Sequence, residues 1–179
     1  MKDWNVVVTI YQTGFRRALR ALQDFGQAER SPYHNVIVMK VEDPIALLQG
    51  VERRTEETPA LYDAIARVAP ATRAFDFQSA EDFKQGALSI IFEWLPSLKG
   101  RLFHIRLHRR GPKLALRSQD AERYFDDAII DATGKAGLPG RISFGDPDIV
   151  IVIDTVDDRA GLAMWTREDL VRHRLLRPD

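Results

Sequence analysis

The sequence predicts a mixed α/β fold that is divided into two small units. Strand and helix patterns alternate through the first 78 residues, and a new helix pattern starts directly after Gln78. A chain of 179 residues is long enough for one or two hydrophobic cores. We therefore expect one domain at residues 1–78 and a second at residues 79–179.

The first unit is expected to have the element order strand, helix, strand, strand, helix, strand. Its expected strands lie at residues 4–11, 28–30, 36–41 and 72–77. Apolar side chains recur at helical spacing from Phe15 to Phe25, and this pattern stops at Gly26. The order is that of the ferredoxin-like βαββαβ pattern.

Two more helix starts are visible in this unit. Asp43 and Thr58 are each followed by proline, which combines an N-cap residue with proline at the first helical position. Apolar residues from Leu61 to Val68 continue the second pattern at helical spacing. We expect this helix to end at Pro70.

The second unit continues to alternate strands and helices. Its expected strands lie at residues 102–110, 149–153 and 162–165. Ser79 is expected to cap the first helix, and Ser118 to cap a helix at residues 119–135. Thr166 and Asp169 have the spacing of a capping box at the start of a last short helix.

The strand at residues 102–110 has two chemically opposite faces. Phe103, Ile105 and Leu107 alternate with His104, Arg106, His108 and Arg110. Side chains on one face of a strand lie about 7 Å apart, which is close to the spacing of phosphates on a nucleic-acid strand. The alternation therefore predicts one face for a hydrophobic core and one for a polyanion.

Two opposed blocks of charge are hidden in a net charge of zero. The chain has 26 basic and 26 acidic residues. Residues 99–117 contain seven Lys or Arg and no acid, whereas residues 118–158 contain ten acids and three bases. A polarised surface of this kind can steer an anion. The alternative is that both blocks are ordinary solvated surface.

Residue patterns for catalysis or metal binding are weak. The chain has no cysteine, so disulfides and thiolate ligands are excluded. Aspartates between residues 146 and 158 could hold a divalent cation, but turn chemistry explains their positions. His104 and His108 would lie about 14 Å apart in a strand, which is too far to share an ion. We expect no enzyme activity, no metal and no cofactor.

The second half of the chain resembles a THUMP domain, an RNA-binding module of tRNA-modifying proteins. The residues that carry the resemblance are Phe103, Arg106, Arg110, Gly111, Ser118, Glu122, Arg123, Asp146-Pro147-Asp148 and Thr166-Arg167-Glu168-Asp169-Leu170. They extend over roughly residues 79–179, and a ferredoxin-like unit is the usual companion of this domain.

The resemblance implies binding to tRNA near its acceptor end, with the chemistry performed elsewhere. The chain ends at Asp179 without a fused catalytic domain. It therefore resembles stand-alone family members, which present tRNA to a separate cytidine acetyltransferase. We expect a non-catalytic RNA-binding protein with tRNA and a separate tRNA-modifying enzyme as partners. The alternative is a ferredoxin-like protein-interaction or regulatory module that binds no RNA.

The RNA contacts are expected on the basic strand, on the turn that follows it and on the last helix. The expected RNA-binding residues are Arg101, His104, Arg106, His108, Arg109, Arg110, Lys113, Arg117, Arg172 and Arg174. Met1-Lys2-Asp3-Trp4 leads directly into a strand pattern rather than a secretory leader. The longest apolar run, Ile149–Ile153, is far too short to span a membrane. A cytoplasmic location, without membrane or DNA contacts, is therefore expected.

Overall fold

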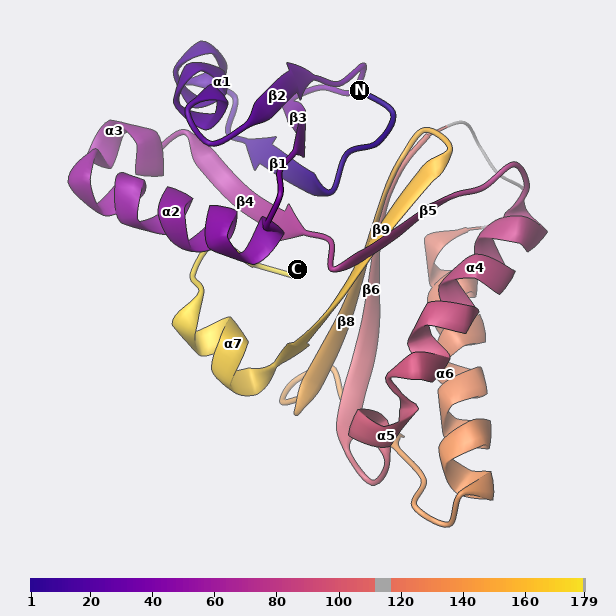
Figure 1. Cartoon of the computed structure of the whole chain (residues 1–179). Coiled ribbons are helices and arrows are strands. Elements are labelled where there is room, and N and C mark those ends of the chain that lie inside the picture. The colour runs from indigo at the N-terminus through magenta and orange to yellow at the C-terminus, as the bar shows by residue number, and fades with distance from the viewer. Residues whose placement is uncertain (112–116, 179) are drawn as a thin grey trace. The chain divides into compact units, whose positions relative to one another are not determined.

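A computed structural model describes residues 1–111 and 117–178, which form two compact units (Figure 1). Unit 1 contains Met1–Thr72 and Leu170–Arg177, and unit 2 contains Arg73–Asp169 and Pro178. The mixed α/β class is confirmed. No helix of the described residues is both long and apolar enough to cross a membrane.

Unit 1 has one antiparallel sheet with the strand order β2-β3-β1-β4. Its elements are β1 (Val6–Ile10), α1 (Phe15–Gln23), β2 (Gln27–Arg30), β3 (Val36–Lys40), α2 (Pro44–Glu57), α3 (Pro59–Tyr62) and β4 (Ile65–Pro70). The central strand β1 pairs with β3 on one side and with β4 on the other, and Val6, Val7 and Val8 are fully buried. This apolar strand forms because its Val-rich sequence can bury both of its faces.

The region after α3 differs from the prediction. Residues 65–70 form strand β4 and not the expected end of a helix, so α3 stops at Tyr62. The helical spacing of Leu61, Ile65 and Val68 was misleading because β4 is buried on both faces and shows no alternation of period two. Tertiary pairing with β1 decides the conformation here.

The expected strand at residues 72–77 forms, but it belongs to the other sheet. Strand β5 (Arg73–Asp76) pairs with β9 (Arg159–Thr166) of unit 2, with Phe75 opposite Ala160. The units therefore divide between Thr72 and Arg73, earlier than the boundary expected near Gln78. Strand β4 takes the place of the last strand of the βαββαβ order in unit 1.

The C-terminal segment at residues 170–177 returns to unit 1 as part of its fold. Leu175 and Leu176 are buried, and the Leu175 carbonyl accepts a hydrogen bond of 2.8 Å from Val68 N. Arg67 Nε donates to Leu176 O at 3.2 Å. The segment thus extends the backbone hydrogen bonding of β4. The expected domain at residues 1–78 did not include this C-terminal segment.

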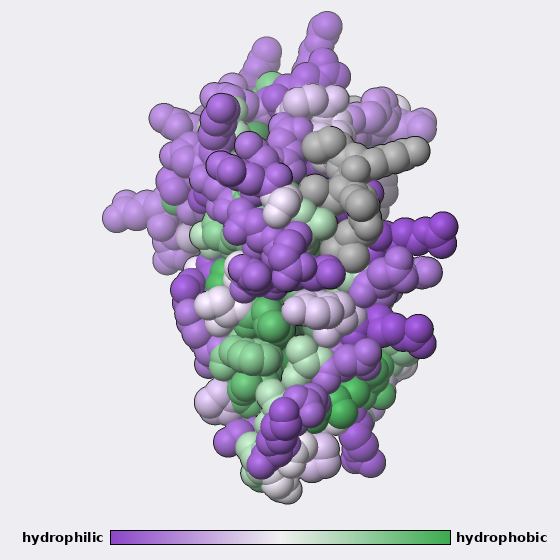
Figure 2. Space-filling view, turned by 90° about the vertical axis from the view of Figure 1, so that its right-hand side faces the viewer, coloured by the Kyte–Doolittle hydropathy of each residue, from purple (hydrophilic) through white to green (hydrophobic). Residues whose placement is uncertain are grey.

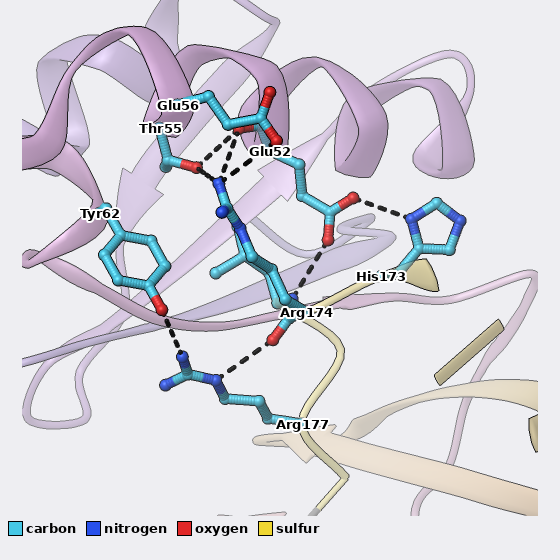
Figure 3. A network of polar contacts seen from close by, with 8 residues as sticks. Glu52, Thr55, Glu56, Tyr62, His173, Arg174 and Arg177 are labelled. Atoms are coloured by element: carbon cyan, nitrogen blue, oxygen red, sulfur yellow. Dashed lines mark hydrogen bonds and ion pairs between the residues drawn. The ribbon is translucent and has the colours of Figure 1, made fainter. Parts of the chain in front are cut away.

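Polar side chains fix the same segment to α2 (Figure 3). The two carboxylate oxygens of Glu52 contact His173 Nδ1 at 2.8 Å and Leu175 N at 3.1 Å. Arg174 Nη2 donates to Thr55 Oγ1 at 3.0 Å, and its guanidinium lies 4.9 Å from the ring centre of Tyr62. Buried groups in this arrangement have partners, as burial of polar atoms requires.

Unit 2 has a mixed sheet with the strand order β5-β9-β8-β6-β7. Its remaining elements are α4 (Ala80–Glu93), α5 (Leu95–Leu98), β6 (Leu102–Arg110), α6 (Ser118–Lys135), β7 (Arg141–Ile142) and β8 (Ile149–Val156). Helix α7 (Arg167–Arg172) begins in unit 2, and its residues from Leu170 onward belong to unit 1. β6 runs parallel to both β7 and β8, and β9 runs antiparallel to β8. Helices α4 and α6 lie side by side on one face of this sheet (Figure 1).

The helix starts in the described residues test the predicted caps. Asp43 accepts hydrogen bonds from Ile45 N and Ala46 N, and Ser79 Oγ accepts one from Asp82 N, which confirms both caps. Thr166 and Asp169 bond each other reciprocally as a capping box. The cap at Ser118 is wrong, because Ser118 is already helical and Arg117 occupies the N-cap position.

Candidate nucleic-acid interface

The inner face of β6 lies in the core of unit 2, as the alternation predicts. Phe103, Ile105 and Leu107 are buried with residues of α4 and α6, and Phe103 and Phe125 are fully buried. The strand extends from Leu102 to Arg110, within the predicted bounds. The apolar half of the two-faced strand is therefore confirmed.

The outer face of β6 is not the open row of cations that the sequence suggests. His104 is only 4% exposed and its Nδ1 lies 3.1 Å from Ser143 O. His108 Nε2 lies 2.8 Å from Pro178 O. Arg110 Nη1 forms an ion pair of 2.9 Å with Asp154, and both side chains are mostly buried. The outer face of β6 is thus partly covered and partly neutralised, and RNA contact by these residues stays a prediction.

The reason is the position of β6 within the sheet. Strand β8 pairs with β6 from Phe103 to Arg110 in parallel register, which places Asp154 opposite His108. A carboxylate on the neighbouring strand can then reach the Arg110 guanidinium, and a half-buried arginine requires such a partner. Asp154, the acid that pairs with Arg110, comes from the acidic block of the sequence.

The other predicted residues do not form one patch. Arg101 and Arg117 are exposed, and Arg109 is half-buried. Lys113 lies outside the described residues. Arg172 and Arg174 belong to unit 1, where Arg174 contacts Thr55 and Tyr62.

Arg101 lines a separate hollow of unit 2, of about 350 Å³, together with Arg167. Arg167 is paired there with Asp146 at 3.0 Å and Asp148 at 3.3 Å. Asp148 also accepts a hydrogen bond of 2.9 Å from Leu102 N. These aspartates therefore act as partners of an arginine and of the backbone, and no cluster of three potential metal ligands occurs among residues 1–111 and 117–178.

A second hollow of unit 2 gathers polar groups between α6, β6 and the segment after β7. This hollow, which we name the α6 groove, has a volume of about 520 Å³. It is lined by Arg106, Gln119, Glu122, Arg123, Asp126, Asp127, Ile142 and Phe144. Arg106 is the RNA-binding residue of the prediction that lies in it.

Two carboxyl groups of α6 that line the α6 groove differ in their hydrogen bonding. Glu122 Oε1 accepts a hydrogen bond of 2.7 Å from Leu107 N, which satisfies the edge of β6 where no strand pairs with it. Asp126 is 5% exposed, and its Oδ1 has no hydrogen-bond partner among the described residues. Burial, and then the charges of Glu122 and Asp127, raise the pKa of Asp126 to about 7. Near neutral pH this carboxyl group can therefore hold a proton and donate it in a hydrogen bond.

An aromatic ring completes the α6 groove. Phe144 is 73% exposed, and its ring centre lies 5.6 Å from that of the buried His104. Arg123 is exposed on α6 nearby in the same lining. Exposed aromatic rings beside guanidinium groups are the parts with which proteins stack and hold single-stranded nucleic acid.

The groove differs from the apolar surface on the face that carries α4 and α6. Figure 2 shows apolar side chains gathered in the lower part of this face, where α4 and α6 end. Phe92 at the end of α4 is 41% exposed and Leu138 after α6 is 58% exposed. Single exposed apolar residues such as these are ordinary on a protein surface, whereas the lining of the α6 groove combines an aromatic ring with charges of both signs.

Glu122, Asp126 and Phe144 carry no sequence pattern that assigned them to a binding site. One signal was present, because Glu122 and Asp126 are four residues apart and must share a helix face. No sequence pattern indicated that Phe144 is exposed, because the residue lies outside any helix or strand and so belongs to no periodic pattern.

Comparison with known structures shows that the fold is THUMP-like. PH1313 from Pyrococcus horikoshii Ot3 matches 89% of this chain with a TM-score of 0.63 at 14% identity. A 4-thiouridine synthetase, solved as an RNA complex with bound ATP, matches 92% with a TM-score of 0.56 at 12% identity. The chain spans 53% and 42% of those two proteins. No family model and no curated protein matches the sequence.

The same comparison corrects one expectation. A possible methylase from Clostridium difficile 630 matches 92% of the chain at 14% identity with a TM-score of 0.54, and the chain spans 42% of it. The fold thus occurs in a protein described as a possible methylase. We expected that this chain is not an enzyme because its sequence lacks catalytic patterns. That expectation is wrong, because the same fold occurs in a possible methylase.

Proposed function

We propose that the chain binds RNA and acts in tRNA modification. The observation that carries the proposal is the α6 groove, where exposed Phe144 lies with Arg106 and Arg123 on a THUMP-like unit. An unpaired base would stack on Phe144, and the arginines would hold the adjacent phosphates. Protonated Asp126 would donate a hydrogen bond to an acceptor on the base edge.

The RNA complex of the thiouridine synthetase supports the same reading, since that protein shares the fold. In the finer form of the proposal, the RNA is a tRNA. A tRNA-modifying enzyme such as a cytidine acetyltransferase then acts on the bound tRNA. Because Arg110 is paired with Asp154 and His108 contacts Pro178 O, the proposed contact lies at the open edge of β6 and not on its outer face.

Replacing Phe144 by alanine tests this proposal. Loss of one stacked base should weaken tRNA binding by about 5- to 150-fold, because base–aromatic stacking contributes roughly 1–3 kcal/mol per base. The slope of affinity against salt concentration should stay unchanged, because phenylalanine carries no charge. Fluorescence anisotropy with labelled tRNA measures both quantities.

The matched control is Phe92→Ala, which removes another partly exposed phenylalanine from unit 2 outside the groove. Melting curves establish that both variants are folded. If folded Phe144→Ala binds tRNA as tightly as the Phe92 variant and the wild type, the α6 groove is not the RNA contact.

A further inference from the structure

Helix α1 of unit 1 presents a row of arginines that no predicted site includes. Its buried residues are Ala18 and Leu22, whereas Arg16, Arg17 and Arg20 are exposed. The first turn contains no acidic residue. The helix is therefore amphipathic, and Arg16, Arg17 and Arg20 make its exposed side basic.

These arginines line a hollow together with a residue of α2. The hollow has a volume of about 430 Å³ and is lined by Arg16, Arg17, Arg20, Ala21, Asp24 and Arg54. Four guanidinium groups and one carboxylate give the lining a formal charge of 4 − 1 = +3. We name this feature the arginine hollow.

The one acid of the arginine hollow is already paired. Asp24 Oδ2 lies 3.3 Å from Arg54 Nη1, and the Arg54 guanidinium also lies 5.5 Å from the ring centre of Phe25. Arg17 Nη1 donates to Ala60 O at 3.1 Å, which orients its side chain without neutralising its charge. Within residues 1–111 and 117–178, no hydrogen bond or ion pair engages Arg16 or Arg20.

A concave surface with unneutralised guanidinium groups differs from ordinary solvated charge. Arginines that converge from two helices repel each other, and a bound anion would relieve this repulsion. Guanidinium forks bind phosphate oxygens with two parallel hydrogen bonds. No aromatic side chain lines the arginine hollow, so its chemistry suits a phosphate group and not a nucleobase.

We infer that the arginine hollow is a second nucleic-acid contact, which binds backbone phosphates without reading base sequence. The identity of the ligand as RNA rests on the proposed function, whereas the capacity to bind phosphate rests on unit 1 alone. The α6 groove of unit 2 would hold an unpaired base, and the arginine hollow of unit 1 would add affinity that depends on salt.

The double variant Arg16→Ala with Arg20→Ala tests the inference in the full chain. Removing two phosphate contacts should weaken tRNA binding and make the slope of log K against log salt shallower by about 1.4 to 1.8. The effect should be equal for tRNAs of different sequence. A charge-matched control, Lys2→Ala with Arg53→Ala, removes two exposed cations of unit 1 outside the hollow and should leave the slope close to that of the wild type.

Isothermal titration calorimetry with inorganic pyrophosphate measures anion binding without RNA, and so separates this inference from the proposed function. Wild type, the control and Phe144→Ala should bind pyrophosphate, and the Arg16/Arg20 variant should lose most of this binding. Pyrophosphate binding without tRNA binding would keep the anion site but overturn its RNA role and the proposed function. If the folded Arg16/Arg20 variant binds tRNA and pyrophosphate with the same affinities as its control, the arginine hollow is solvated surface and the inference is wrong.

Discussion

Replacing Phe83 by alanine should lower the free energy of unfolding by about 3–5 kcal/mol, the range for a buried phenylalanine. Phe83 is 2% exposed on α4, and its ring centre lies 5.2 Å from Phe77, 6.0 Å from Phe125 and 6.4 Å from Phe75. The substitution leaves a cavity where α4, α6 and the start of unit 2 meet. Chemical denaturation of the purified chain measures the change.

Phe92→Ala is the matched control for this prediction, because it makes the same substitution on the same helix. Phe92 is 41% exposed, so its loss should change stability by roughly half a kcal/mol. Equal destabilisation by the two substitutions would contradict the packing of α4 through Phe83.

Replacing Asp126 by asparagine should change how stability depends on pH. The pKa of Asp126 is raised from 3.8 to about 7 in the folded state, so the folded chain holds this proton more tightly than the unfolded chain. Stability from this group is complete below about pH 4 and is lost as the pH rises toward and through 7. One pKa unit corresponds to about 1.4 kcal/mol, so the ionised carboxylate destabilises the fold by up to roughly 4 kcal/mol above pH 7.

The variant Asp126→Asn removes this ionisation. Its stability relative to the wild type should rise steadily between pH 4 and pH 8, as measured by urea denaturation at several pH values. The control Asp131→Asn changes an exposed aspartate of α6 that pairs with Lys135, and its difference from the wild type should vary little. A constant difference for Asp126→Asn across this range would show that Asp126 is not held in a buried, proton-retaining position.

Much of the secondary structure could be predicted from local signals. The apolar residues of β6 and β8 predict a strand from each segment's own sequence. The caps at Asp43 and Ser79 depend on side chains that bond backbone groups at most three residues away. The errors lie where long-range pairing decides. β4 is a strand because it pairs with β1, and β5 joins the second sheet because it pairs with β9.

The candidate site was less predictable than the fold. Alternation on β6 gave the correct inner face but could not reveal that Asp154 of β8 neutralises Arg110 on the outer face. Parallel register over eight residue pairs sets that contact, and it depends on the packing of distant segments. Arg106 was found because it belongs to the alternating basic row of β6, whereas Phe144 lacked any periodic signal.

The most direct test of RNA binding is a salt titration of tRNA affinity with the wild-type chain. If four to six phosphates are neutralised, log K should fall against log salt with a slope of about −3 to −4 for a single-stranded contact. The chain should also bind tRNA more tightly than heparin, a polyanion without bases, because stacking on Phe144 adds to the electrostatic attraction. A flat salt response, or equal affinity for heparin, would contradict RNA recognition and favour a regulatory module that binds no RNA.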